Sequence, residues 1–138
     1  MKVTINWLDN VKFKGISADG HEVAIDGPES AGGNNDGMRP MELMLLSVGA
    51  CSAFDVMTIL QKGRQAVSDC RCEVSGTRAD AIPAVFTDIH LHFILSGDGL
   101  SEKHVARAIN LSADKYCSAS IMLSKAAKVT HDFEILDT

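Results

Sequence analysis

The chain lacks an excess of positive charge, and this bears first on nucleic acids. It carries 13 lysines and arginines against 18 aspartates and glutamates, which gives a formal net charge of −5. A protein that binds a phosphate backbone displaces counterions with a stripe of basic side chains, and the sequence has no such stripe. We therefore expect no nucleic-acid partner, while the net negative charge favours solubility.

Long uninterrupted apolar runs are also lacking. Residues 1–7 alternate between apolar and polar types, which predicts a strand and not a cleaved signal segment. The longest apolar stretch, residues 38–60, is broken by four residues unsuited to a membrane span: Arg39, Pro40, Glu42 and Asp55. We therefore expect no membrane partner and a cytoplasmic location, where the four cysteines would be reduced thiols.

What the chain does have is the composition of one globular domain. Apolar residues make up 46% of its 138 residues and charged residues 22%, and neither a repeat nor a low-complexity tract is present. A chain of this length buries roughly two-thirds of the surface that its unfolded form exposes. We predict a single domain over residues 1–138.

Hydrophobic periodicity predicts an α+β fold. Strands are expected around residues 3–7, 11–13, 23–25, 67–79, 89–95 and 129–135. Residues 27–38 are rich in glycine and asparagine and predict a surface loop. Helices are expected over residues 40–65, from an N-cap at Ser101 to Tyr116, and over residues 118–128.

The long helix over residues 40–65 is apolar around almost its whole circumference. Pro40 suits a first helical position, and Glu42 complements the positive end of the helix dipole. A helix with so small a polar face must be buried nearly all round, and a chain of this size cannot easily surround it. We therefore expect a second copy of the chain to pack against it in a homodimer.

The cysteines differ in their settings. Cys70 and Cys72 share the apolar face of a predicted strand, which indicates packing, and a Cys-x-Cys pair without a second Cys-x-x-Cys is a weak zinc signal. We therefore expect no metal. Cys117 precedes the predicted helix at Ser118, where free N–H groups would lower a thiol pKa, although buried packing is an equal alternative.

Cys51 lies eleven residues beyond Pro40 within the long helix. At 1.5 Å per residue the separation is roughly 16 Å, so neither the helix dipole nor Arg39 of the same helix reaches the thiol. Asp55, one turn further along, opposes thiolate formation. A cation that activates Cys51 must come from another segment or from a second chain.

Two motifs carry a family resemblance. The stretch 38–43 reads Met-Arg-Pro-Met-Glu-Leu and is followed by Ser-Val-Gly-Ala-Cys at 47–51, while 115–118 reads Lys-Tyr-Cys-Ser. Together they resemble the OsmC/Ohr family (osmotically inducible protein C and organic hydroperoxide resistance protein). The arginine before the proline and the Cys-x-x-x-Asp-Val run at 51–56 are similar to its YhfA-type branch.

The resemblance implies an α+β, OsmC-like fold with antiparallel sheets and a long central buried helix, assembled as an intertwined homodimer with its active sites at the interface. By analogy with the family's peroxidases, Cys51 is the peroxidatic thiol and Cys117 the resolving thiol. The ligand is then a small apolar hydroperoxide, and a dithiol reductant reopens the disulfide. No metal or organic cofactor is implied.

The sequence departs from the family pattern at two places. The family's peroxidases hold their thiolate with an arginine in the N-terminal strands, whereas residues 1–38 of this chain contain no arginine. Met41 stands where those peroxidases have a glutamate. Glu42 follows one position later, which rotates its side chain by about 100° around the helix. Arg39, brought near by a partner helix, is the candidate replacement cation, although it could equally be a surface residue. The candidate catalytic set is Cys51, Cys117, Arg39 and Glu42.

Two other hypotheses stay open. The chain could be a non-enzymatic, stress-associated dimer that holds a small molecule in an apolar interface cleft, with cysteines that only pack or trap electrophiles. It could also, more distantly, form a metal site from Cys51, Cys117 and His131.

Overall fold

The computed structural model describes residues 1–136, which form two compact units, Met1–Met44 and the chain from Leu45 onward. Helix α1 (Pro40–Lys62) begins in the first unit and continues into the second. The content of strands and helices confirms the predicted α+β class, and each unit contains one three-stranded sheet.

In the first unit the three predicted strands form an antiparallel meander of β1 (Val3–Asp9), β2 (Lys12–Ser17) and β3 (Glu22–Ile25). The loop that follows includes a short 3-10 turn, η1 (Glu29–Ala31), and is organised by the buried carboxylate of Asp26. That carboxylate accepts hydrogen bonds from the backbone N–H groups of Gly27, Asn34 and Asp36. These contacts, the Asp36 N–H above all, lower the pKa of Asp26.

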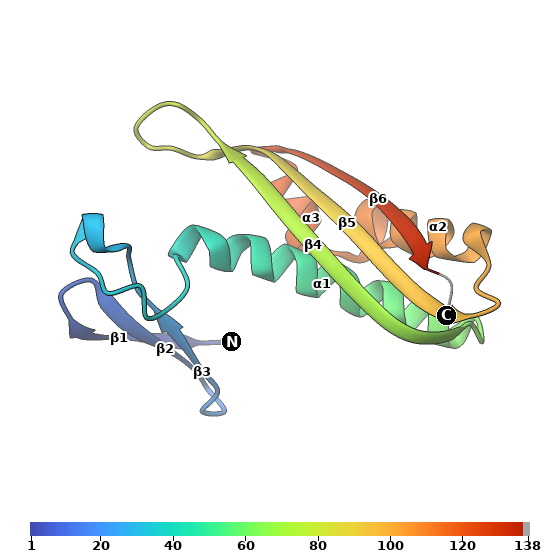
Figure 1. Ribbon diagram of the computed structural model, residues 1–138, viewed down its shortest axis with the longest axis horizontal. Coiled ribbons are helices and arrows are strands. Elements are labelled where there is room, and N and C mark those ends of the chain that lie inside the picture. The colour runs from blue at the N-terminus through green and yellow to red at the C-terminus, as the bar shows by residue number, and fades with distance from the viewer. Residues whose placement is uncertain (137–138) are drawn as a thin grey trace. The chain divides into compact units, whose positions relative to one another are not determined.

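The second unit holds the remaining strands and helices (Figure 1). These are β4 (Ala66–Arg78), β5 (Phe86–Asp98), α2 (Glu102–Leu111), the π-helical turn η2 (Ser112–Tyr116), α3 (Ser118–Leu123) and β6 (Lys128–Leu136). The Ser101 side chain accepts from the His104 N–H, which confirms the predicted N-cap of α2.

Two details of this unit correct the sequence-based prediction. Strand β5 pairs antiparallel with β4 but parallel with β6, so this sheet is mixed and not purely antiparallel. The reason is that α2, η2 and α3 carry the chain back to the starting end of β5, as a parallel crossover requires. Helix α3 also ends at Leu123 and not near residue 128, because the next N–H groups close a tight turn onto Met122 and Leu123.

The strand register shows that α1 and α2 pack on one face of this sheet. Cys72 pairs with Phe93, which pairs with Phe133, so these side chains share a face. Residues of α1 approach Cys72, and α2 lies beside Phe133. The core lies on this face, and its four central β5 side chains are almost fully buried: Ile89, Leu91, Phe93 and Leu95.

Within one chain, α1 is buried along a stripe and not all round. Its buried residues are Val48, Gly49, Ser52, Val56 and Leu60. Phe54 is 74% exposed and Leu46 is 52% exposed on the same helix. Among the described residues α1 is also the helix whose length and composition would suit a membrane span, a criterion that core helices of soluble proteins meet as well.

Candidate functional site

The structure brings Cys51 and Cys117 together although 66 residues separate them in the sequence. Asp55 joins them from the next turn of α1, and the three ligand atoms, two Sγ and one carboxylate oxygen, all lie within 4.8 Å of one another. Cys117 is buried, while Cys51 and Asp55 are half-buried. We call these three residues the thiol cluster.

The π-helical turn η2 sets the position of Cys117. Its closing hydrogen bond runs from the Cys117 N–H to the Ser112 carbonyl at 2.8 Å, five residues back. Cys117 thereby becomes the N-cap of α3, and its Sγ accepts a hydrogen bond from the Ser120 N–H at 3.3 Å. The expected placement at a helix start is therefore confirmed.

The expected effect of that placement on acidity is wrong. Burial raises the pKa of the Cys117 thiol to about 11 and outweighs the Ser120 N–H, which lowers it. The hydrogen bond with Cys51, together with the charges of Cys51 and Asp55, raises it further. At neutral pH Cys117 is therefore a protonated thiol.

A chain of buried hydroxyls supports the cluster. The Ser112 hydroxyl donates to Oδ2 of Asp55 at 3.1 Å and lies 3.0 Å from the hydroxyl of Ser52. Both serines are at most 3% exposed. Ser52, Ser112 and Ser120 were not among the predicted site residues, although a serine beside Cys51 in a largely apolar helix was an available signal.

The structure gives Arg39 and Glu42 local partners within the first unit. Oε1 of Glu42 accepts from the Arg39 backbone N–H at 2.8 Å, which is half of a capping box at the start of α1. The Arg39 guanidinium donates through Nη1 to Oδ1 of Asn35 at 2.9 Å and to the Gly37 carbonyl at 3.2 Å. Catalytic roles for these two residues stay predictions.

Cys70 and Cys72 lie on the helix-facing side of β4, away from the solvent face. A Cβ atom at Gly49 of α1 would be 3.9 Å from the Cys72 sulfur. Burial raises the pKa of Cys72 to about 12, with a further contribution from Cys70, and burial also raises that of Cys70. Both are weakly reactive thiols, as their predicted packing role requires.

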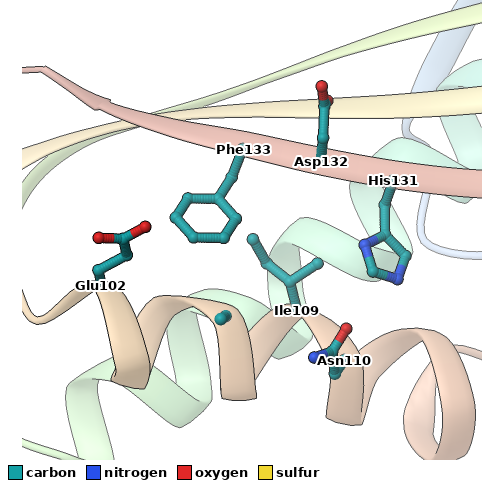
Figure 2. A pocket seen from close by; sticks show the side chains of 7 residues that line it. Glu102, Ile109, Asn110, His131, Asp132 and Phe133 are labelled. Carbon is teal, nitrogen blue, oxygen red and sulfur yellow. The ribbon is translucent and has the colours of Figure 1, made fainter.

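His131 does not join the thiol cluster within the part of the chain that the structure describes. It lines a pocket of about 320 Å³ between α2 and β6 (Figure 2). Figure 2 shows His131 directed towards Asn110, and the ring of Phe133 beside Ile109. The alternation of β6 explains this, because His131 and Phe133 share the helix-facing side.

The opposite face of the sheet carries a charged cluster. Oδ1 of Asp132 contacts Nε2 of His90 at 2.9 Å and Nδ1 of His92 at 2.6 Å. Nε2 of His92 lies 3.1 Å from a carboxylate oxygen of Glu134. The hydrogen bonds to Asp132 and then Glu134 raise the pKa of His92, and those from His92 and His90 lower that of Asp132. His90 and His92 therefore lie on the face of the sheet opposite the core side chains of β5.

Comparison with known proteins identifies relatives of this chain. The family model described as OsmC-like protein matches residues 33–132. Protein YhfA of Escherichia coli (strain K12) is 43% identical over 136 residues, covering 99% of this chain and 98% of that protein.

Two solved structures illustrate the range of the fold. A hypothetical protein from Aquifex aeolicus VF5 is 29% identical with a TM-score of 0.87, covering 99% of this chain and 96% of that one. The organic hydroperoxide resistance protein OhrB of Bacillus subtilis is 15% identical with a TM-score of 0.64, covering 97% and 98%. With a family model that spans most of its length and a relative of such identity, this chain belongs to the OsmC-like protein family.

Proposed function

We propose that this protein is a thiol-dependent peroxidase that reduces small organic hydroperoxides through Cys51 and Cys117. The observation that carries the proposal is the proximity of the two thiols, whose sulfur atoms lie within 4.8 Å. A disulfide has an S–S distance of about 2.05 Å, and the closeness of the two sulfur atoms is what supports the formation of this bond. The likeness to OhrB contributes the scaffold alone.

The two thiols have distinct environments, and these assign their roles. Cys51 is half-buried and accessible to a substrate, whereas Cys117 is buried with a pKa of about 11. The attacking thiol must reach the peroxide, so the more accessible Cys51 attacks. The buried Cys117 then reacts as the resolving thiol.

The reaction balances without a further oxidant. The Cys51 thiolate attacks the outer oxygen of R–O–OH, the O–O bond breaks, and the alkoxide leaves as the alcohol after taking a proton. The Cys117 sulfur then attacks the sulfenic acid, forming the S–S bond while the S–O bond breaks. The Cys117 proton leaves with the hydroxyl group as water. A dithiol reductant returns two electrons and reopens the disulfide.

Asp55 makes a cation necessary in this scheme. Its carboxylate lies beside both sulfurs and opposes a negative charge on either. We propose that Arg39 of the partner subunit supplies the compensating charge, and that Glu42 orients the N-terminal turn from which Arg39 projects.

The proposal includes a soluble, cytoplasmic homodimer. Exposed apolar side chains on α1, among them Phe54 and Leu46, support a second copy packing on this helix, as do the exposed apolar residues of β1. A reducing compartment suits a thiol pair that a dithiol must return to its active form.

The test is peroxide consumption in the presence of dithiothreitol with cumene hydroperoxide as substrate. Wild type should consume peroxide and, without reductant, become two hydrogen atoms lighter by intact mass, while Cys51→Ser should do neither. Without reductant, Cys117→Ser should turn over once and stop at the sulfenic acid, which a dimedone adduct reveals. Cys70→Ser is the matched control and should behave as wild type. Wild-type consumption no faster than that of Cys51→Ser contradicts the proposal.

A second candidate function rests on the pocket between α2 and β6. It combines an apolar wall of Ile109 and Phe133 with the polar groups of Glu102, Asn110 and His131, which suits a small amphipathic molecule. If the chain is a non-enzymatic binder, an apolar fluorescent probe should bind Cys51→Ser as tightly as wild type. It should fail to bind Ala106→Phe, in which the added ring fills the pocket.

A further inference from the structure

We infer that the thiol cluster binds one zinc ion in the reduced protein, through the sulfurs of Cys51 and Cys117 and a carboxylate oxygen of Asp55. The inference goes beyond the proposed peroxidase activity and does not depend on it. The spacing of the cysteines predicted no metal site. The inference reverses that prediction, because the third ligand is an aspartate one helical turn from Cys51.

The distances between the donor atoms fit a tetrahedral site. With Zn–S of about 2.3 Å and Zn–O of about 2.0–2.2 Å, neighbouring ligand atoms lie roughly 3.3–3.8 Å apart. The three donor atoms here are all within 4.8 Å of one another. Each pair is therefore at most about 1.5 Å wider than in a formed zinc site.

The surrounding hydrogen bonds orient the ligands as outer partners of metal sites do. Ser112, itself close to Ser52, donates to Oδ2 of Asp55 and fixes the carboxylate towards the sulfurs. A carboxylate has about four acceptor positions, so this bond leaves lone pairs for a metal. The Ser120 N–H donates to the Cys117 sulfur and stabilises negative charge on it.

The donor set also selects the metal. Two thiolates with one carboxylate favour zinc over magnesium or calcium, which prefer oxygen ligands throughout. Three protein ligands leave a fourth position for water, and the half-buried Cys51 and Asp55 provide an entry path to the buried Cys117. Such a site exchanges its metal more readily than a closed four-ligand one.

Zinc binding must release protons here. Zinc binds a thiolate and not a thiol, so each cysteine that ligates the metal gives up its proton. Zinc affinity should consequently rise with pH. The same two sulfurs cannot ligate zinc and form a disulfide together, so the metal and the disulfide are mutually exclusive.

The experiment titrates reduced, metal-free protein with zinc sulfate against a chromophoric chelator and repeats the titration with Co²⁺. Wild type should bind one ion per chain, with a sulfur-to-cobalt charge-transfer band. Asp55→Asn, which keeps the shape of the side chain but loses its charge, should weaken zinc binding at least tenfold, and Cys51→Ser and Cys117→Ser more. Cys70→Ser is the matched thiol control and should leave affinity and band unchanged.

Two outcomes overturn the inference: wild type without stoichiometric zinc binding, or binding that survives Cys51→Ser and Cys117→Ser but is lost in Cys70→Ser. Circular dichroism and thermal unfolding show whether each variant is folded. If Cys117→Ser is unfolded, alkylation of the folded wild type decides instead. Zinc should protect Cys51 from iodoacetamide, and unchanged alkylation of Cys51 in excess zinc contradicts the inference. Since no peroxide is present, the result is separate from that of the peroxidase assay.

Discussion

The hydroxyl of Ser112 donates a hydrogen bond to Oδ2 of Asp55 at 3.1 Å, joining the turn after α2 to the middle of α1. Ser112 is fully buried, so its hydroxyl has no competing partner in solvent. It holds the two segments that carry Cys51 and Cys117 next to one another. The thiol cluster therefore depends on a polar contact inside an otherwise apolar core.

Replacing Ser112 with alanine should destabilise the protein. Removing a buried partner leaves the Asp55 carboxylate short of a donor, at a cost of about 1–3 kcal/mol. Urea unfolding at fixed protein concentration measures the loss. Thr58→Ala is the matched control, because the Thr58 hydroxyl donates to the Phe54 carbonyl of its own helix, and it should cost under about 0.5 kcal/mol. Equal losses in the two variants would contradict a special role for Ser112.

Gly49→Ala tests the close approach of α1 to β4. An added Cβ would lie 2.6 Å from Cγ2 of Val74, a stiff β-branched side chain. Overpacking of this kind costs about 1–3 kcal/mol and should outweigh the roughly 1 kcal/mol that alanine gains over glycine within a helix.

Chemical denaturation of two further variants separates the cost of overpacking from the gain in helix propensity. Gly63→Ala, whose added Cβ would have its nearest contact at 3.4 Å, should be neutral or mildly stabilising. Val74→Ala should make Gly49→Ala tolerable in the double variant, since the clashing methyl group is gone. Additive losses in the double variant would show that the contact is not the cause.

His92 should titrate above its ordinary value of 6.5, because Asp132 and Glu134 stabilise its charged form. A raised folded-state pKa means that the stability from this contact is complete below 6.5 and is lost as the pH rises through the folded pKa. Asp132, whose pKa is lowered, loses its share as the pH falls below 3.8. The contacts of His92 with Asp132 and Glu134 therefore stabilise the fold most between pH 3.8 and the folded-state pKa of His92.

NMR titration of the imidazole resonances measures the His92 pKa directly. Asp132→Asn should return it towards 6.5, leaving the smaller contribution of Glu134. The resonances of His21, which lies in the first unit, provide the internal reference. A His92 pKa at or below 6.5 in wild type would contradict the observed contacts.

Phe54→Glu should weaken the proposed homodimer. Phe54 is 74% exposed in one chain, and burying a phenylalanine contributes up to about 3 kcal/mol, which corresponds to roughly 100-fold in a dissociation constant. Sedimentation velocity over a range of concentrations measures the effect. Gln61→Glu introduces the same charge at another exposed position of α1 and should dimerise normally. A stable wild-type monomer would contradict the dimer itself.

Arg39→Ala tests the proposed cation of the peroxidase. Removing a charge that stabilises the reacting thiolate should lower kcat/KM by about 100-fold, and Arg39→Lys should recover part of that loss. The pH at which Cys51 reaches half its maximal alkylation rate should move upward in Arg39→Ala. Loss of the hydrogen bonds to Asn35 and Gly37 alone would lower the thermal midpoint and leave that profile in place.

The sequence by itself determined the local elements. Alternation predicted the strands of both sheets, and Pro40 and Ser101 located the starts of α1 and α2, because periodicity and capping are properties of neighbouring residues. The two cysteine motifs likewise identified the family. The residues around Cys117 placed it at the start of a helix, but they predicted a lowered thiol pKa, whereas the pKa is raised.

The tertiary structure decided what depends on residues distant in the chain. Burial of Cys117 overcame its N-terminal position, and the crossover through α2 and α3 made the β5–β6 pair parallel. Packing also places Asp55, and not His131, beside the two thiols. His131 instead lines the pocket between α2 and β6, because alternation along β6 directs its side chain there. Ser112 contacts Asp55 and Ser52, which are 57 and 60 residues away in the sequence. Such contacts, and the desolvation of buried groups, exist only once the chain has folded.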